Sequence, residues 1–159
     1  MNAEDVLKYG HRTVMNAVDG LTDAQVLVEG VCGWWSVRHI VAHLASHELV
    51  LNDVLRQFID PAVSTPTLDS YAAQHLAFND IEVEKRKAAS YADLLREYEQ
   101  ASATTRELIT KIPLERRRQA GTLPWYGDEY DLEDLIAYSN YGHKREHCAQ
   151  IAVYRDTLK

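Results

Sequence analysis

The chain has 159 residues, of which 46% are hydrophobic and 26% are charged, as in an ordinary globular domain. Its formal net charge of −7 argues against nucleic acid as the main partner, because phosphate binding requires a basic surface. No secretory pattern opens the chain and no apolar run approaches the about 20 residues that span a bilayer, so we expect a cytoplasmic protein without a membrane partner.

Hydrophobic residues recur at helical spacing along most of the chain. The first such segment covers residues 3–19, and Thr22 with Gln25 then forms a capping-box pattern that predicts a short helical turn. Ser36 is the expected N-cap of the second long helix, which the proline-containing stretch "DPAVSTP" ends. Residues 67–86 follow as a less regular segment.

The third long helix is predicted to begin after Ser90, its N-cap, and to end at Pro113. Residues 114–130 are expected to form a loop with a local basic patch. The three consecutive arginines at 116–118 are most simply a solvated helix end, and binding of an anionic substrate there is the less favoured interpretation.

The last helix is predicted from Leu132 to about residue 158, with Asp131 as its N-cap. No alternating pattern of the kind typical of strands is present. The sequence therefore predicts an all-α fold, a four-helix bundle that forms a single domain over residues 1–159. An extra helical segment lies between its second and third long helices.

Histidines are concentrated in two of these helices. "HIVAHLASHE" repeats histidine every four residues, at His39, His43 and His47, beside the apolar stripe of the second helix. In "GHKREHCAQI", His143 and His147 both face the apolar side of the last helix. Histidines four apart on one helix can bind a single metal ion. One histidine of the first group with the two of the second would make a catalytic-type site with an open position, but spacing does not choose which one.

Two other interpretations compete with a metal site. Inward histidines often hydrogen-bond a carbonyl or carboxylate in the core, so a purely structural bundle stays open. The sequence H-x-x-E-H from His143 to His147 is also the signature of the inverzincin proteases. That class needs a further acidic ligand well downstream, and only twelve residues follow His147, so we do not expect such a protease.

Taken together, "GWWSVRHIVAHLASHE" and "YGHKREHCAQI" resemble the two motifs of the DinB/YfiT-like superfamily. The pattern W-[ST]-x(6)-H-[LV] matches from Trp35 to Leu44, and H-x-x-x-H-x-x-Q-I matches from His143 to Ile151. The resemblance covers essentially the whole chain. It implies a four-helix-bundle metalloenzyme related to thiol-dependent transferases and to the mycothiol-dependent maleylpyruvate isomerases.

By position, the resemblance implies the metal ligands His43, His143 and His147, and a divalent ion, commonly nickel or zinc. His47 lies one turn beyond His43, where it would hydrogen-bond a metal-bound water, act as a catalytic base, or face solvent. Other residues are weaker candidates for lining or bordering the pocket: Trp35, Glu48, Asn79, Tyr138 and Tyr141.

Two residues beside the ligand motif need separate explanations. Gly142 inside a helix costs about 1 kcal/mol relative to alanine, which close packing or clearance at the site would explain. Cys148 points about 100° away from His147 around the helix, so we expect it to pack and not to act as a nucleophile. The chain has two cysteines, Cys32 and Cys148, which are too few for a disulfide framework or a cysteine-based zinc site.

The implied function is that of a metal-dependent thiol S-transferase or hydrolase. The bound ion would lower the pKa of a water or of a low-molecular-weight thiol, which then attacks a small electrophilic substrate. The alternative is a non-catalytic stress-response bundle that binds a metal or another small ligand. Members of the superfamily are often dimers, so a homodimer is possible.

Overall fold

The computed structural model describes residues 2–159, and within this range the fold is all-α, as predicted. The one strand-like feature in these residues is an isolated bridge between Cys32 and Trp35. In chain order the elements are α1 (Ala3–Val18), η1 (Gln25–Leu27), α2 (Val37–Ile59), α3 (Pro66–Gln74), α4 (Ala77–Lys85), α5 (Tyr91–Thr110), α6 (Leu114–Arg117), α7 (Leu132–Asp134), η2 (Leu135–Tyr141) and α8 (Gly142–Asp156).

The predicted N-cap residues do lie at the starts of their helices. The side chains of Ser36, Ser90 and Asp131 each accept a hydrogen bond from a backbone N–H in the first turn of the helix that follows. Thr22 and Gln25 exchange the two hydrogen bonds of the predicted capping box, with lengths of 2.9 and 3.2 Å. Local sequence signals therefore determine these helix starts.

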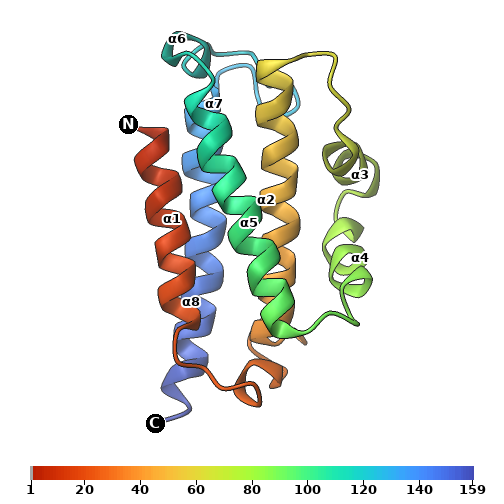
Figure 1. Ribbon diagram of the computed structural model, residues 1–159, viewed down its shortest axis with the longest axis vertical. Coiled ribbons are helices and arrows are strands. Elements are labelled where there is room, and N and C mark those ends of the chain that lie inside the picture. Colours follow the sequence, from red (N-terminus) through yellow and green to blue (C-terminus); the bar gives the residue numbers. More distant parts are fainter. Residues whose placement is uncertain (1) are drawn as a thin grey trace.

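The less regular segment between the second and third long helices forms α3 and α4. Both pack against α2, on the side away from α1 (Figure 1). Pro66 occupies the first turn of α3, where its missing N–H costs nothing. His75, between the two helices, has a positive φ of 49° with ψ of −125°, and positive φ is uncommon outside glycine.

The predicted loop at 114–130 begins with the short helix α6, which changes the environment of one arginine. Arg117 is buried, and it donates hydrogen bonds to the Ile112 carbonyl (2.7 Å) and to the Glu4 carboxylate (2.8 Å). The expectation that all three arginines are solvated is therefore wrong for Arg117. The turn of α6 points this side chain back toward α1, where a carboxylate and a carbonyl satisfy its guanidinium.

The periodicity predicted one continuous α-helix from Leu132 to about residue 158, but the structure is not α-helical throughout this range. The short α7 leads into η2, which is π-helical, and α8 starts only at Gly142. A π-helical stretch has more residues in each turn than an α-helix, so angles calculated at 100° per residue do not hold across it. Tyr138, in the middle of η2, is 62% exposed and lies away from the core.

Gly142 has no close neighbour that would explain its glycine. A Cβ added there would meet only the carbonyl oxygen of Ala137 at 3.8 Å, an ordinary van der Waals distance. The expectation that clearance at the site requires this glycine is therefore wrong.

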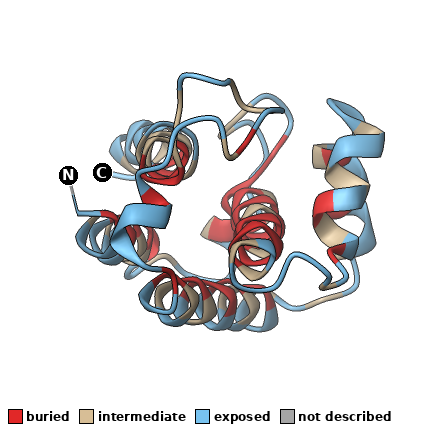
Figure 2. Ribbon diagram, turned by 90° about the horizontal axis from the view of Figure 1, so that it is seen from above, coloured by how far each residue is buried: buried red, intermediate tan, exposed pale blue. Residues whose placement is uncertain are grey.

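The core consists of two apolar clusters with a polar layer between them. Seen from above, buried residues of the long helices face the middle of the molecule (Figure 2). Along α2, α5 and α8, buried polar residues separate the cluster around Ile40 and Tyr98 from the cluster around Leu55 and Ile109. The polar residues of this layer are Ser46, Glu48, Asn52, Ser102, Thr105, Lys144 and His147.

None of the helices in residues 2–159 is both long enough and apolar enough to cross a membrane.

Candidate metal centre

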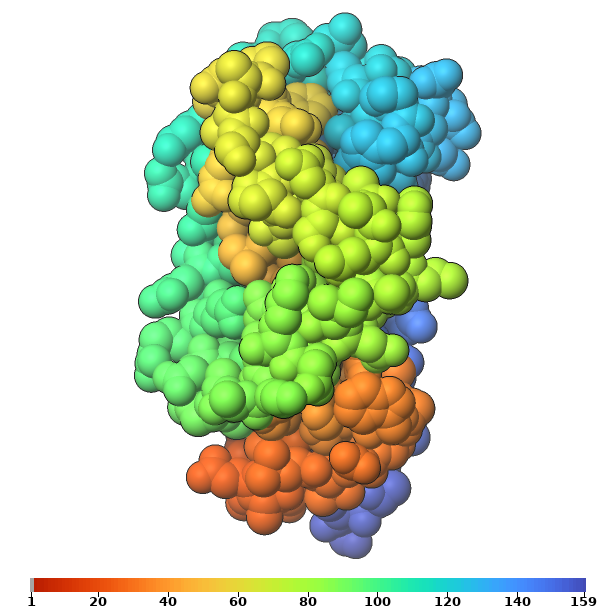
Figure 3. All heavy atoms as spheres, turned by 90° about the vertical axis from the view of Figure 1, so that its right-hand side faces the viewer, coloured from red at the N-terminus to blue at the C-terminus, as the bar shows by residue number. Residues whose placement is uncertain are grey.

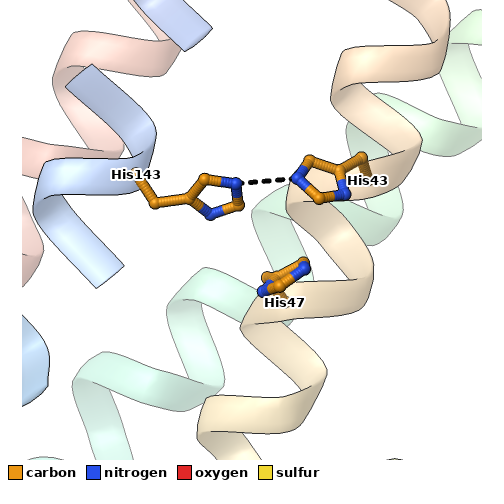
Figure 4. Close-up of side chains that lie close together, drawn as sticks. All are labelled: His43, His47 and His143. Atoms are coloured by element: carbon orange, nitrogen blue, oxygen red, sulfur yellow. Dashed lines mark hydrogen bonds between the residues drawn. The ribbon is translucent and has the colours of Figure 1, made fainter. Parts of the chain in front are cut away.

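Four histidines converge where α2 faces α8, at the polar layer. His43 and His47 come from successive turns of α2 and face His143 of α8 (Figure 4). One ligand atom from each of these three lies within 4.8 Å of the others. The His143 Nε2 atom is 2.7 Å from His43 Nε2 and 3.0 Å from His147 Nε2.

The two contacts of His143 Nε2 cannot both be good hydrogen bonds between neutral imidazoles. Each ring nitrogen either carries one hydrogen or offers one lone pair in the ring plane, so it forms one such bond. The second contact leaves a buried nitrogen without a proper partner, which is costly. A cation that accepts the lone pairs of His43, His143 and His147 removes this conflict, so the donor set fits a divalent metal ion.

Burial favours the neutral form of these imidazoles, which is the form that binds metal. It is the largest cause of a lowered pKa at His43, His47, His143 and His147. The neighbouring imidazoles lower the pKa of His143 further, to about 3. Burial therefore favours the neutral form of all four rings near pH 7, and repulsion between the rings opposes the protonation of more than one.

Hydrogen bonds distinguish the two outer histidines. The His147 Nδ1 atom lies 2.8 Å from Gln150 Oε1, an acceptor, so Nδ1 carries the hydrogen and Nε2 keeps its lone pair. The His47 Nε2 atom lies 3.0 Å from Asn79 Oδ1, so in that ring Nε2 carries the hydrogen and Nδ1 keeps the lone pair. His43 Nδ1 is buried and has no hydrogen-bond partner among the described residues.

The motifs predict the ligands His43, His143 and His147. The three histidines whose ligand atoms lie within 4.8 Å of one another are His43, His47 and His143. The two sets therefore differ in one member, although His147 also lies within 3.0 Å of His143. His39, which spacing alone left open, lies outside the cluster, because its Nδ1 atom is 3.0 Å from the Ser36 backbone nitrogen at the start of α2.

The weaker candidates fall into two groups. The Trp35 ring centroid lies 4.8 Å from that of His43, so Trp35 borders the cluster, and Asn79 bonds His47. Tyr138 and Tyr141 do not line the pocket that adjoins the histidines, which has a volume of about 870 Å³. Its lining includes His47 and His143, so the cluster opens into it.

A buried ion pair beside the histidines was missed by the sequence reasoning. Lys144 and Glu48, 2% and 0% exposed, form a salt bridge between α8 and α2. Glu48 also accepts hydrogen bonds from Asn140 Nδ2 (3.0 Å) and Thr105 Oγ1 (2.7 Å). Burial alone would raise the pKa of Glu48, but Lys144 and these bonds outweigh it, so the pKa is lowered. The sequence did contain an indication of this pair, because Glu48 directly follows His47 and Lys144 directly follows His143.

Gly10 of α1 provides room for this pair. A Cβ at position 10 would lie 3.3 Å from the Lys144 Cδ atom and 3.2 Å from a ring carbon of Tyr141, closer than most such contacts. The glycine therefore allows α1 to pack against the lysine side chain.

Comparison with known proteins identifies the family. Residues 7–131 match the family described as the mycothiol maleylpyruvate isomerase N-terminal domain. The matched range contains His43 and His47 and ends before α8, so the second histidine motif depends on its own pattern and position. Searches of curated proteins and of solved structures returned no significant match. The resemblance noted from the two motifs is confirmed: the chain belongs to the mycothiol maleylpyruvate isomerase N-terminal domain family, which is DinB/YfiT-like.

Proposed function

We propose that this protein is a divalent-metal-dependent enzyme of the DinB type, built on a four-helix bundle, that activates a water or a low-molecular-weight thiol for attack on a small electrophile. One observation carries the proposal. The Nε2 atoms of His43 and His147 both meet Nε2 of His143, at 2.7 and 3.0 Å, where hydrogen bonding cannot satisfy all three. The family match and the packing of α1, α2, α5 and α8 around one interior support the same assignment.

In this proposal His43, His143 and His147 hold the ion, with nickel or zinc expected for a site made of imidazoles. The bound ion supplies a Lewis acid that lowers the pKa of a water or thiol. Gln150 fixes the hydrogen of His147 on Nδ1 and so directs its Nε2 lone pair at the cluster.

His47 is the proposed catalytic base. Its contact with Asn79 places the hydrogen on Nε2 and leaves a lone pair on Nδ1, and its side chain lines the pocket next to His143. An imidazole in this state takes a proton from a water or thiol bound beside it. Because the pKa of His47 is lowered, its neutral form is available below pH 7 as well.

The thiol version of the reaction is supported by the name of the matched family, which includes mycothiol. A low-molecular-weight thiol as co-substrate gives S-transfer, and water in the same role gives hydrolysis. The second candidate function, a non-catalytic metal-binding bundle, is favoured by the closeness of His47 to His43 and His143. If His47 were a fourth ligand, the ligand sphere would be closed and no position would remain for a substrate.

The test is the metal content of tag-free protein, measured by elemental analysis beside His43→Ala and His11→Ala variants. His11 is a histidine of α1 that stacks on Tyr98, outside the cluster, so it controls for the loss of one imidazole. We expect about one equivalent of metal in the native and His11→Ala proteins and little in His43→Ala. Equal metal in both variants, or none after reconstitution, contradicts the proposal. Thiol-transfer and hydrolysis assays on the loaded protein then decide between the two reactions.

A further inference from the structure

We infer that the pocket beside the histidines takes an uncharged, mainly apolar small molecule and discriminates against one that carries carboxylates or other anionic groups. This inference rests on the proposed function only in treating that pocket as the place where the substrate binds. It concerns the chemistry of the pocket walls, which is independent of whether a metal ion is bound.

The pocket has a polar inner end and apolar walls. Its volume of about 870 Å³ is in the range that holds drug-sized molecules. His47, Asn79, Asn140 and His143 line the part nearest the histidine cluster. The apolar and aromatic residues of the lining come from α2, α3, the link between α3 and α4, the segment before α7, and η2: Val50, Leu51, Val54, Leu68, Tyr71, Ala72, Leu76, Trp125, Tyr126 and Leu135.

The described residues of the lining offer little positive charge to an anion. They include no lysine or arginine, and the one basic side chain outside the histidine cluster is that of His75, which is exposed. The one carboxylate of the lining, Asp69, accepts a hydrogen bond from Thr65 and would repel an anion. The buried Lys144, which follows His143 in the sequence, is paired with Glu48 and does not line the pocket. An anionic group placed among the apolar walls would lose hydration without meeting a lysine or arginine, which is unfavourable.

A metal ion at the cluster would not change this conclusion for a molecule with two anionic groups. An ion held by His43, His143 and His147 would be at the inner end of the pocket, and its charge would offset one such group. The second group would extend along the walls formed by residues such as Leu51 and Leu135, where the described lining has no lysine or arginine. An uncharged molecule with an apolar part along the walls and one polar group at the inner end fits the pocket best.

Exposed apolar side chains at the pocket support the same class of ligand. Leu76 is 91% exposed and Trp125 is 52% exposed, and they come from different segments of the chain. Figure 3 shows this face, with α3 and α4 in yellow to green beside residues 118–131 in cyan to blue. Large exposed apolar side chains that line one pocket are typical of a binding site, because a ligand covers them.

The experiment compares two fluorescent probes that share one ring system. N-phenyl-1-naphthylamine is neutral, and 1-anilinonaphthalene-8-sulfonate is the same molecule with a sulfonate added. Each is titrated into metal-free protein, so that an ion cannot attract the sulfonate. We expect the neutral probe to bind at least about tenfold more tightly, since burying an unpaired charge costs more than the roughly 1.4 kcal/mol that corresponds to tenfold. Equal or tighter binding of the sulfonate, or no binding of either probe, overturns the inference.

Two tryptophan variants test where the neutral probe binds. Trp125→Ala removes a wall of the pocket, and Trp34→Ala removes a tryptophan of similar exposure, 53%, outside the lining. We expect the first to weaken binding at least about fivefold and the second to leave it unchanged, with unchanged circular dichroism in both. Equal effects in the two variants overturn the inference. The metal analysis above is a separate measurement, so failure of metal binding is distinguished from failure of the pocket assignment.

Discussion

At the scale of single residues, the position of one hydrogen on each imidazole decides its chemistry. The ring centroids of His47 and His147 both lie 4.7 Å from that of His143, but their amide partners bind opposite ring nitrogens. Gln150 leaves Nε2 of His147 free to face His143, whereas Asn79 occupies Nε2 of His47. The hydrogen bonds, more than the distances, therefore favour His147 as a ligand and His47 as a base.

Replacement of these two histidines gives a direct prediction. We expect His147→Ala to lose most of the bound metal, because it removes one of three ligands. His47→Ala should keep about one equivalent of metal while its turnover falls about 10²- to 10⁴-fold, the contribution typical of a general base. Elemental analysis and activity assays on the same preparations measure both effects. The reverse result, with metal lost in His47→Ala and kept in His147→Ala, would show that the ligands are His43, His47 and His143.

At the scale of secondary structure elements, α2 and α8 must keep their register for the histidines to meet. The buried salt bridge between Glu48 and Lys144 joins these two helices immediately after His47 and His143. Asn140 bonds both partners, since its Nδ2 donates to Glu48 and its Oδ1 accepts from Lys144 at 3.0 Å. A displacement of one helix along the other would leave these buried charges unpaired, so the pair opposes such movement.

Removing one member of this pair should be costly. Lys144→Met leaves the Glu48 carboxylate buried without an opposite charge, and we expect a loss of about 3–5 kcal/mol in the free energy of unfolding. Addition of Glu48→Gln to this variant should restore part of the loss, because it removes the uncompensated charge. Lys159→Met, which breaks an exposed pair with Asp156, serves as the control and should cost less than about 1 kcal/mol. Urea denaturation measures all three; similar losses in the two single variants would contradict a buried, paired Lys144.

At the scale of the whole molecule, the polar layer divides the core into two apolar clusters. A metal ion bound at this layer would join α2 to α8. The four histidines that converge at this layer come from α2 and α8, which are separated by most of the chain length. A ligand that binds only the folded state stabilises it in proportion to the logarithm of its concentration. The site and the stability of the fold are therefore linked.

Metal addition should raise the melting temperature of the metal-free protein, and a chelator should reverse the rise. At a free metal concentration of about 1,000 times Kd, we expect about 4 kcal/mol of added stability. Calorimetry of the native protein, His43→Ala and His11→Ala measures the effect. The rise should persist in His11→Ala and disappear in His43→Ala; a rise of the same size in all three would place the metal elsewhere.

Acid should destabilise the metal-free protein through the same histidines. Their pKa values are lowered on folding, that of His143 to about 3, so below pH 6.5 the unfolded chain binds more protons than the folded chain. The stabilisation is fully present above pH 6.5 and is lost as the pH falls toward 3. Each histidine in this window contributes a slope of about 1.4 kcal/mol per pH unit.

Urea midpoints between pH 7.5 and 4.5 measure this dependence, and His143→Asn should show a shallower slope than the native protein. A native protein whose stability rises as the pH falls would contradict neutral, buried imidazoles.

The sequence by itself determined the features that depend on near neighbours along the chain. Caps such as Ser36, Ser90 and Asp131 act on the turn that follows, and the i, i+4 spacing of His143 and His147 places both on one helix face. Helix starts, the all-α class and the candidate histidines were therefore predictable.

Only the tertiary structure decided the features that depend on distant partners. Asn79 meets His47 across 32 positions of sequence, and Asn140 meets Glu48 across 92. Neither contact has a periodic signature, and the π-helical turns of η2, which precede His143, change the faces that an α-helical period predicts. The roles of the histidines, the buried ion pair and the walls of the pocket follow from the packing of helices that the sequence order keeps far apart.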